Sequence, residues 1–470
     1  MEPVSPHDID ACLRVLARAA SDPADPALAA VRSAVDLAYR SVKKQRRAAR
    51  RVDRREHDLA LVATASRYRD EVPPTVVRSV PTGTADRAMN PGDAPRTSLR
   101  GGRRCYVCKA TYQHIDVEYH MLCPTCSAEN TARRHARCDL TGRRTLVTGG
   151  RVKIGFHTAL KLLRDGAEVL VTTRFPRDAA RRFAAVADAA DWTDRLWIHG
   201  VDFLDLPGVL GLVDTVRARW GTLDILVNNA AQTIARPPAY HREVRAAELA
   251  PLQGGAATIA ISGNTAPMPR AMPATPAERA TLTTVGMGVD LLGWFPAGER
   301  DETGEPLDLR PQNSWVLRVD EVSPREWLEV QVVNAFVPFL LTGHLKPLML
   351  RSPHPDRYVV QVSAMEGSFA RDRKTARHPH TNMAKAGLNM LTRTVADEYA
   401  AEGIYMSSVD TGWVTDERPH ASKQEHRAGG FRPPLDVIDG AARVYDPIVR
   451  GVSGEPVYGV FLKDYRRVPW

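Results

Sequence analysis

Four of the six cysteines in this 470-residue chain fall into two CxxC pairs. Fourteen residues separate the first pair, Cys105 and Cys108, from the second pair, Cys123 and Cys126. Each CxxC turn can present two thiolates to one ion, and four thiolates at this spacing are typical of the tetrahedral site of a zinc ribbon. Because four thiolates close such a site to substrate, we expect a structural zinc that serves folding or docking.

Four more potential metal ligands lie close to these pairs: His114, His120, His135 and Cys138. They raise the number of candidate ligands to eight, which is enough for a second zinc beside the first. The wide gap between His114 and His120 makes a poor chelating turn, so ordinary polar histidines are the favoured interpretation.

A second group of reactive side chains lies in residues 359–387, VVQVSAMEGSFARDRKTARHPHTNMAKAG. Lys385 follows Thr381 by four residues, and two histidines, His378 and His380, come just before them. An imidazole titrates near neutral pH, whereas a threonine hydroxyl is far too weakly acidic to exchange a proton there. The histidines are therefore candidates for proton transfer, although ordinary polar residues near a pocket mouth are the favoured interpretation.

A glycine-containing turn, Thr148–Gly155 (TGGRVKIG), follows an apolar strand and opens a helix. Glycines in such a turn let a pyrophosphate approach the backbone amides at a helix N-terminus. From Thr145 onward, apolar strands such as AEVLVTT and LDILVNNA alternate with helix-length segments, which implies βαβ units and a parallel sheet. We therefore predict an α/β, doubly wound, Rossmann-type domain over residues 141–470. The alternation fails at about residues 232–322, which we interpret as an insertion beside the sheet.

The order of these segments resembles the short-chain dehydrogenase/reductase (SDR) family. The turn is similar to the TGxxxGxG turn of that family, in which Gly149 and Gly155 match and Lys153 replaces the middle glycine. This lysine could lie over the pyrophosphate as a counter-charge, or could block the close approach that glycine permits. Asp202 matches the adenine-facing aspartate of the family, and Asn228 begins an NNA segment that matches its NNAG strand end.

The resemblance also implies a cofactor. The second strand ends in Thr172-Thr173-Arg174, with no acid at the ribose-binding position, and Arg177 follows closely. By similarity this favours the 2′-phosphate of NADP(H), with NAD and a pair of surface arginines as the alternatives. The cofactor-binding residues implied are Thr148, Gly149, Arg151, Lys153, Ile154, Gly155, Arg174, Asp202, Asn228, Lys385 and Thr411.

The family uses four catalytic groups: an Asn that holds a water, a Ser that orients the carbonyl, a Tyr that transfers the proton, and a Lys that lowers the Tyr pKa and binds the nicotinamide ribose. Matched by position, Asn334 and Lys385 are retained, and Thr381 stands in place of the tyrosine. Matching VSAMEG to the family's ISSxxG puts Ala364 at the serine position and Ser363 one residue earlier. Because adjacent side chains on a strand face opposite sides of the sheet, Ser363 is expected to face away from the substrate. Our catalytic candidates are Asn334, Ser363, Thr381 and Lys385.

The excess positive charge of the chain, +9, lies in residues 1–144, which carry 26 Lys and Arg against 17 Asp and Glu. We predict a basic helical region over residues 1–70, a linker over 71–104 and the zinc-ribbon module over 105–140. Nine cations lie between Arg40 and Arg55, spread round the helix with no aromatic residues among them. This pattern favours a solvated helix or a partner-docking arm over nucleic-acid contact.

We therefore expect an NADP(H)-binding, SDR-like oxidoreductase acting on an unidentified carbonyl or alcohol, with an altered proton donor. The alternative is a catalytically silent dinucleotide-binding scaffold that docks a protein partner through the zinc ribbon and basic helices. No apolar run reaches the roughly 18 residues of a membrane span and no signal pattern opens the chain, so we expect a cytoplasmic protein outside the membrane. The final residues resemble a family tail that packs at subunit contacts, which implies a homo-oligomer.

Overall fold

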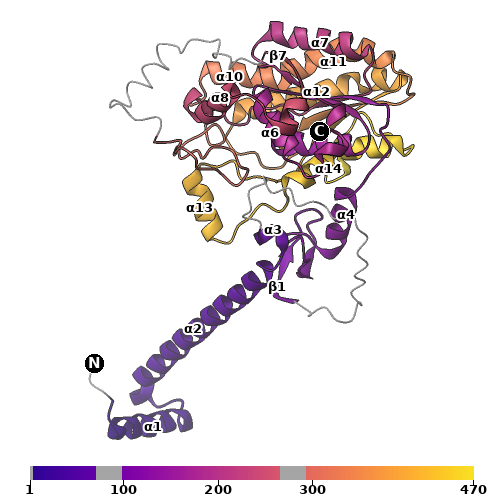
Figure 1. The fold of residues 1–470 in the computed structure, drawn as a ribbon. Helices are drawn as coiled ribbons and strands as arrows, with labels where there is room; N and C mark the ends of the chain where they lie inside the picture. The colour runs from indigo at the N-terminus through magenta and orange to yellow at the C-terminus, as the bar shows by residue number, and fades with distance from the viewer. Residues whose placement is uncertain (1–3, 70–97, 265–292) are drawn as a thin grey trace.

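A nine-stranded sheet with helices on both faces forms the main body of the protein, and a helical arm projects from it (Figure 1). The structure is a computed structural model that describes residues 4–69, 98–264 and 293–470. The strand order is β11-β10-β9-β8-β6-β3-β4-β5-β7, and all neighbouring pairs are parallel except β10 and β11. The predicted doubly wound α/β fold is confirmed.

The strands of this sheet are short and mostly buried on both faces, which is why they form near-continuous apolar runs in the sequence. Their bounds are β3 (Arg144–Val147), β4 (Glu168–Thr173), β5 (Leu196–Gly200), β6 (Ile225–Asn228), β7 (Ala260–Gly263), β8 (Arg357–Ser363), β9 (Ile404–Asp410), β10 (Phe461–Lys463) and β11 (Arg466–Val468).

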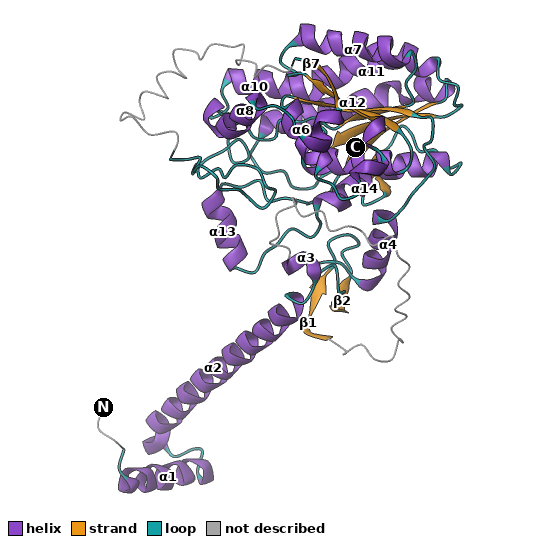
Figure 2. Cartoon of the chain, in the orientation of Figure 1, coloured by secondary structure: helices purple, strands orange, loops and turns teal. Residues whose placement is uncertain are grey.

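Two hydrophobic clusters, one on each face, hold the helices to the sheet. One face carries α5 (Lys153–Arg164), α6 (Pro176–Ala184) and α14 (Val437–Val452). The other face carries α7 (Leu206–Trp220), α11 (Val337–Leu350) and α12 (Pro379–Ala401). Figure 2 shows these helices around the orange strands. The chain runs outward from β3 to β4 and β5 and then crosses to β6, so the crevice beside β3 lies where such folds bind ligands.

The helical run Pro324–Leu350 is long and apolar enough to cross a membrane, by length and composition alone. It consists of α10 (Pro324–Gln331), a π-helical turn (Val332–Phe336) and α11. α11 packs against α7, α12, β6 and β8, with Leu341 and Leu345 fully buried. Its apolar composition therefore serves the core of the domain.

The stretch interpreted as an insertion does more than lie beside the sheet. After α8 (Arg242–Leu249), residues 260–263 form β7, which pairs in parallel with the outer edge of β5. The edge strand β5 presents unpaired backbone groups, and a four-residue segment can pair with them without a recognisable hydrophobic pattern in the sequence. Residues 265–292 of the predicted insertion lie outside the described residues.

The cysteine module consists of the antiparallel pair β1 (Ser98–Arg104) and β2 (Thr111–His114), followed by α4 (Pro124–Arg134). The predicted linker therefore extends too far, because its last seven residues are β1. A strand with a Gly-Gly pair is hard to recognise from its sequence. Gly102 is needed there, since a Cβ on it would lie 2.5 Å from the Thr111 side chain on the facing strand.

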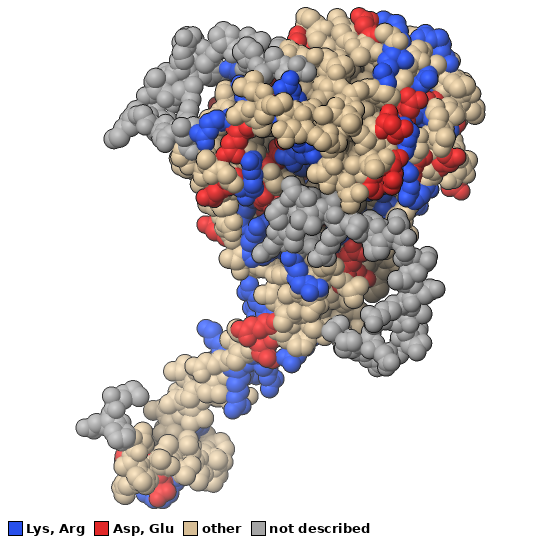
Figure 3. Space-filling model, in the orientation of Figure 1, with Lys and Arg blue, Asp and Glu red and all other residues tan. Residues whose placement is uncertain are grey.

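The N-terminal arm consists of α1 (Pro6–Ser21) and α2 (Ala29–Val62), and the single turn α3 (Ser66–Arg69) follows it. α2 is exposed along most of its length and contacts β1 near its C-terminal end, where the Asp58 carboxylate accepts the amides of Arg100 and Gly101. Figure 3 shows blue cationic side chains on the half of the arm nearest the body. The nine cations between Arg40 and Arg55 lie on α2.

Candidate functional site

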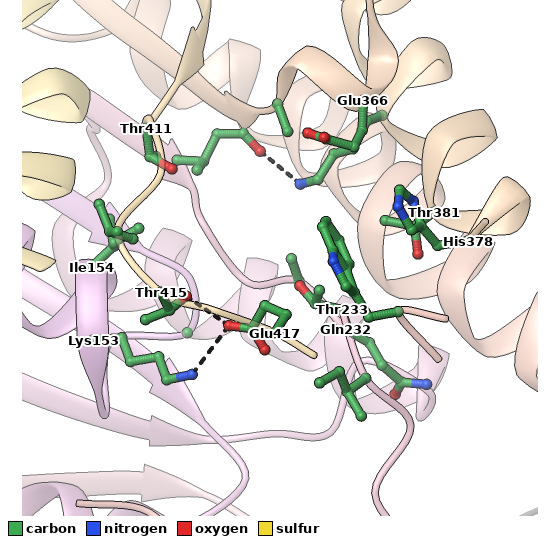
Figure 4. A pocket seen from close by; sticks show the side chains of 18 of the residues that line it. Lys153, Ile154, Gln232, Thr233, Glu366, His378, Thr381, Thr411, Thr415 and Glu417 are labelled. Atoms are coloured by element: carbon green, nitrogen blue, oxygen red, sulfur yellow. Dashed lines mark hydrogen bonds and ion pairs between the residues drawn. The ribbon is translucent and has the colours of Figure 1, made fainter. Parts of the chain in front are cut away.

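A cleft of ≈ 1260 Å³ lies at the carboxyl ends of the parallel strands. It is lined by the glycine turn after β3, the ends of β4, β6, β8 and β9, and the loop after β9. In Figure 4, Ile154, Lys153 and Thr411 lie on one side of the opening and His378 and Thr381 on the other. The sheet therefore brings together the two halves of the site that the sequence separates by about two hundred residues.

The turn after β3 needs glycines because its backbone packs closely against neighbouring segments. Gly149 has φ +68°, and a Cβ on it would lie 2.9 Å from the Cα of Ala230. A Cβ on Gly155 would lie 2.3 Å from the carbonyl oxygen of Gly149. Val152 precedes α5 without a side-chain cap, so the first amides of this helix are available to an anion. These features fit the pyrophosphate of a dinucleotide.

Lys153 occupies the middle-glycine position with φ +54°, the left-handed region that glycine adopts most easily. Its ammonium lies 3.6 Å from the carboxylate of Glu417, across the cleft wall. Burial disfavours the ammonium, but the carboxylates of Glu417, Asp301 and Glu305 outweigh that effect and raise the pKa of Lys153. Lys153 is therefore a charged cleft residue that is held by Glu417.

Three arginines near the end of β4 have different surroundings. Arg174 is exposed and lines the cleft, with its guanidinium 3.5 Å from the Nε2 of His241 and 5.6 Å from the centre of the Phe175 ring. Arg151 also lines the cleft, but it pairs with Asp178 at 2.6 Å and with Glu305. Arg177 donates to backbone carbonyls at the end of α8. Arg174 and Arg151 therefore line the cleft, whereas Arg177 does not.

Asp202 and Thr411 line the cleft as predicted, whereas Thr148, Asn228 and Asn334 do not. The Thr148 hydroxyl accepts the amides of Asn229 and Ala230 at 2.9 Å. Its role is to connect the glycine turn to the end of β6.

Asn228 points into the core, where its Nδ2 donates to Gln361 at 3.0 Å, and the neighbouring Asn229 takes the place at the cleft. Asn229 donates to the carbonyls of Thr148 and Gly149 and so holds the turn. Asn229 and not Asn228 faces the cleft because adjacent side chains at a strand end face opposite sides.

Asn334 lies in the π-helical turn and is buried. Its Oδ1 accepts the amide of Gln232 at 2.7 Å, and its Nδ2 donates to the Gln232 carbonyl. Asn334 therefore positions the backbone that follows β6, with Gln232 itself facing the cleft.

Lys385, Ser363 and Thr381 form a buried polar group on the α12 side of the cleft. The Lys385 ammonium donates to the carbonyl of Val362 at 2.7 Å, and burial lowers its pKa to about 8. Among the described residues, the hydroxyls of Ser363 and Thr381 have no hydrogen-bond partner. Both Ser363 and Ala364 line the cleft, so Ser363 is not turned away from it. Two orphaned hydroxyls beside an amine are suited to a polar ligand.

The two histidines are separated by the start of α12. His378 lines the cleft, stacks on Trp315 with ring centres 4.1 Å apart, and shares a 3.0 Å hydrogen bond between its Nδ1 and Asn382. His380 is fully buried away from the cleft, with its Nε2 3.3 Å from Glu326. Of the two, only His378 lines the cleft.

The loop after β9 is fastened to the end of β8. The Asp410 carboxylate accepts the amides of Met365 at 2.7 Å and Gly412 at 2.9 Å, and Lys463 lies 3.5 Å from it. Thr411 is thereby held at the cleft wall beside the glycine turn.

Several cleft residues have no signal in the sequence. Trp315 and Glu305 come from the insertion, Glu417 from the loop after β9, and Tyr106 and Lys109 from the cysteine module. No motif spacing marks them, because they reach the cleft only through the tertiary fold.

The four predicted metal-binding sulfurs lie within 4.8 Å of one another, with 3.7 Å between those of Cys108 and Cys123. A tetrahedral site with bonds of about 2.3 Å has edges of about 3.8 Å, so the cluster fits one zinc. The described residues contain no second cluster of this kind. His120 lies 3.3 Å from the carbonyl of Arg432, and Cys138 lies 3.1 Å from the hydroxyl of Tyr445.

Comparisons with known proteins agree with this geometry. The short chain dehydrogenase family model matches residues 143–249, and the enoyl-(acyl carrier protein) reductase model matches residues 314–429. An uncharacterized protein of Acanthamoeba polyphaga mimivirus is 32% identical over 374 residues, which are 75% of this chain and 72% of that protein. The chain belongs to the short-chain dehydrogenase/reductase superfamily, a family of oxidoreductases.

Other relatives match over shorter stretches. Carbonyl reductase [NADPH] 1 of Sus scrofa is 40% identical over 89 residues, which are 19% of this chain and 30% of that enzyme. A short chain dehydrogenase of Burkholderia cenocepacia in complex with NADP aligns with 20% identity and a TM-score of 0.44, over 69% of this chain and 97% of its own. The chain thus spans less than a third of the pig reductase in sequence.

Proposed function

We propose that this protein is an NADP(H)-dependent oxidoreductase of a carbonyl or alcohol substrate, in which Lys385 supplies the proton that the family takes from tyrosine. The observation that carries the proposal is the buried amine of Lys385 beside the hydroxyls of Ser363 and Thr381, which have no hydrogen-bond partner in the part of the chain that the structure describes. A group with a pKa of about 8 can give and take a proton near neutral pH, which a threonine hydroxyl cannot.

The cofactor would be held by groups on the other half of the cleft. Its pyrophosphate would lie against the amides at the start of α5 and its adenine near Asp202. Arg174 would contact the 2′-phosphate, so NADPH would bind more tightly than NADH. When bound, the nicotinamide supplies the hydride of the reaction.

The side chains of the α12 half would handle the substrate oxygen. The Ser363 hydroxyl would donate to it, and Thr381 would orient a water in the volume that a tyrosine ring would otherwise fill. The Lys385 ammonium would pass its proton through that water to the developing alkoxide. Proton transfer of this kind contributes about 100- to 10,000-fold to a rate.

The four-cysteine cluster would hold a structural zinc, as its thiolate donor set and its sulfur spacing support. The pig relative's name, carbonyl reductase [NADPH] 1, supports both the cofactor and the substrate class.

The first test is a fluorescence titration of the full chain with NADPH and with NADH, followed by a hydride-transfer assay on a panel of carbonyls. We expect tighter binding of NADPH and turnover that Lys385→Met abolishes. Lys374→Met, which also removes an amine from the cleft lining, is the matched control. Absence of NADPH binding at millimolar concentration would overturn the proposal.

A dinucleotide-binding scaffold is the second candidate, and the replacement of the family's tyrosine by Thr381 favours it. Tight NADPH binding without turnover on any substrate of the panel would support this function instead.

A further inference from the structure

The loop between β9 and α14, residues 411–436, forms one wall of the cleft and includes α13 (His420–Ala428). It carries Thr411, which lies at the wall beside the glycine turn, and Glu417, which holds Lys153. The position of this loop therefore determines the shape of the cofactor half of the site.

The cysteine module holds the beginning of the loop through Tyr106, the residue directly after Cys105. The amide of Trp413 donates to the Tyr106 hydroxyl oxygen at 2.9 Å. The Lys463 ammonium lies 5.8 Å from the centre of the Tyr106 ring, on the side of the β-sheet. Tyr106 also lines the cleft itself.

The same module and α3 hold the end of the loop. His120 lies 3.3 Å from the carbonyl of Arg432, whose guanidinium is 5.1 Å from the centre of the Tyr68 ring. The Tyr119 hydroxyl donates to the carboxylate of Asp439 at 2.7 Å, and Asp439 is fully buried.

Two arginines reinforce this end of the loop through salt bridges. Arg134, on α4, donates to both oxygens of Asp436 at 2.7 and 3.0 Å and to Asp439 at 2.8 Å. Arg67, on α3, contacts Asp436 at 2.5 Å. Asp436 and Asp439 form the capping box of α14, so the loop ends at a point that the module fastens.

We propose that the cysteine module anchors both ends of loop 411–436 and that Tyr106 is a positioning residue for the dinucleotide cleft. Metal loading of the module then controls the affinity of the cleft for cofactor. This inference rests on the proposed function, since it concerns the same cofactor.

The physical reason is the size of the module. A unit of about forty residues cannot bury enough apolar surface to fold firmly without a metal or another cross-link. Loss of the metal would unfold the module, so Tyr106, Tyr119 and His120 would lose their contacts with the two ends of the loop together. The loop would then have to be ordered when the cofactor binds, and that ordering weakens the affinity.

The test compares Tyr106→Phe with Tyr458→Phe, an exposed tyrosine outside the cleft lining. We expect Tyr106→Phe to weaken NADPH binding about threefold to tenfold, as the loss of one hydrogen bond implies. It should also speed tryptic cleavage at Lys423 and Arg427 in the loop, with the melting temperature unchanged. Tyr458→Phe should change none of these.

Removal of the metal with a chelator should weaken NADPH binding and expose the same cleavage sites, and added zinc should reverse both effects. If the native protein binds NADPH and neither Tyr106→Phe nor metal removal changes affinity or cleavage, the anchoring role is wrong. If the native protein does not bind NADPH, the proposed function fails while the cleavage readout still tests the anchor.

Discussion

Lys153 and Glu417 form an ion pair across the wall of the cleft, with 3.6 Å between the ammonium and the carboxylate (Figure 4). Burial disfavours the carboxylate, but Lys153, the Thr415 hydroxyl and Lys423 outweigh that effect and lower the pKa of Glu417 to about 2. The cation that replaces a glycine in the phosphate turn is therefore already neutralised by a residue of the loop after β9.

The first prediction concerns this pair. Glu417→Gln should free the Lys153 charge for the pyrophosphate and tighten NADPH binding about tenfold, which is about 1.4 kcal/mol. Glu425→Gln removes another carboxylate of the cleft lining and should leave the affinity unchanged. Isothermal titration calorimetry measures the NADPH affinity of both variants. Weaker binding by Glu417→Gln would contradict the prediction and would mean that the Lys153–Glu417 pair holds the glycine turn in its binding conformation.

The second prediction is a pH dependence. Burial lowers the pKa of Lys385 to about 8, so its ammonium is the main form below that pH and is lost above it. If this ammonium is the proton donor, kcat/KM for carbonyl reduction should be level below pH 8 and fall about tenfold for each pH unit above it.

Alcohol oxidation needs the neutral amine and should show the opposite dependence on pH. Lys385→Arg, whose guanidinium stays charged, should lose the transition while Lys374→Met keeps it. A pH profile of reduction that is level to pH 10 would exclude Lys385 as the donor.

The third prediction restores the family's phenol. Thr381→Tyr places an acidic hydroxyl four residues before Lys385, and reduction should accelerate by about 100-fold or more. Thr381→Phe supplies the ring without the hydroxyl and is the matched control. Equal rates for both variants in single-turnover experiments would show that the phenol has no role in this cleft.

The fourth prediction concerns cofactor choice. Arg174→Ala should weaken NADPH binding by about tenfold and leave NADH binding nearly unchanged, because a charge-assisted contact to phosphate contributes about 1.5–3 kcal/mol before solvent exposure reduces it. Arg371→Ala, which removes an exposed cation from the α12 side of the same cleft, should not change the ratio of the two dissociation constants. If the ratio is unchanged in Arg174→Ala, another residue recognises the 2′-phosphate.

The fifth prediction concerns metal content. Elemental mass spectrometry should find one zinc per chain. Cys108→Ser should lose this zinc, because the tetrahedral site needs all four thiolates. The melting temperature of the variant should fall, since metal binding energy is part of the folding energy of such modules. Cys12→Ser, which changes an exposed cysteine outside the cluster, should retain both zinc and stability.

Much of the fold could be predicted from short-range patterns. The alternation of strands with helix-length segments gave the parallel sheet, and the spacing of Cys105, Cys108, Cys123 and Cys126 predicted a cluster that the structure assembles. The glycine turn was equally recognisable. In each case the relevant residues lie within one local unit, so their spacing alone carries the information.

The tertiary structure decided which side chains reach the cleft. Asn228 and Asn229 are neighbours of the same type, and only the twist and pairing of β6 determine that Asn229 faces the turn. The contact of Tyr106 with Trp413 joins residues 307 positions apart. Such contacts depend on how helices and loops pack after the sheet has formed, and packing leaves no periodic trace in the sequence. The sequence by itself determined the sheet, the phosphate turn and the cysteine cluster. The packing of distant segments decided which charged side chains and which anchoring hydrogen bonds surround them.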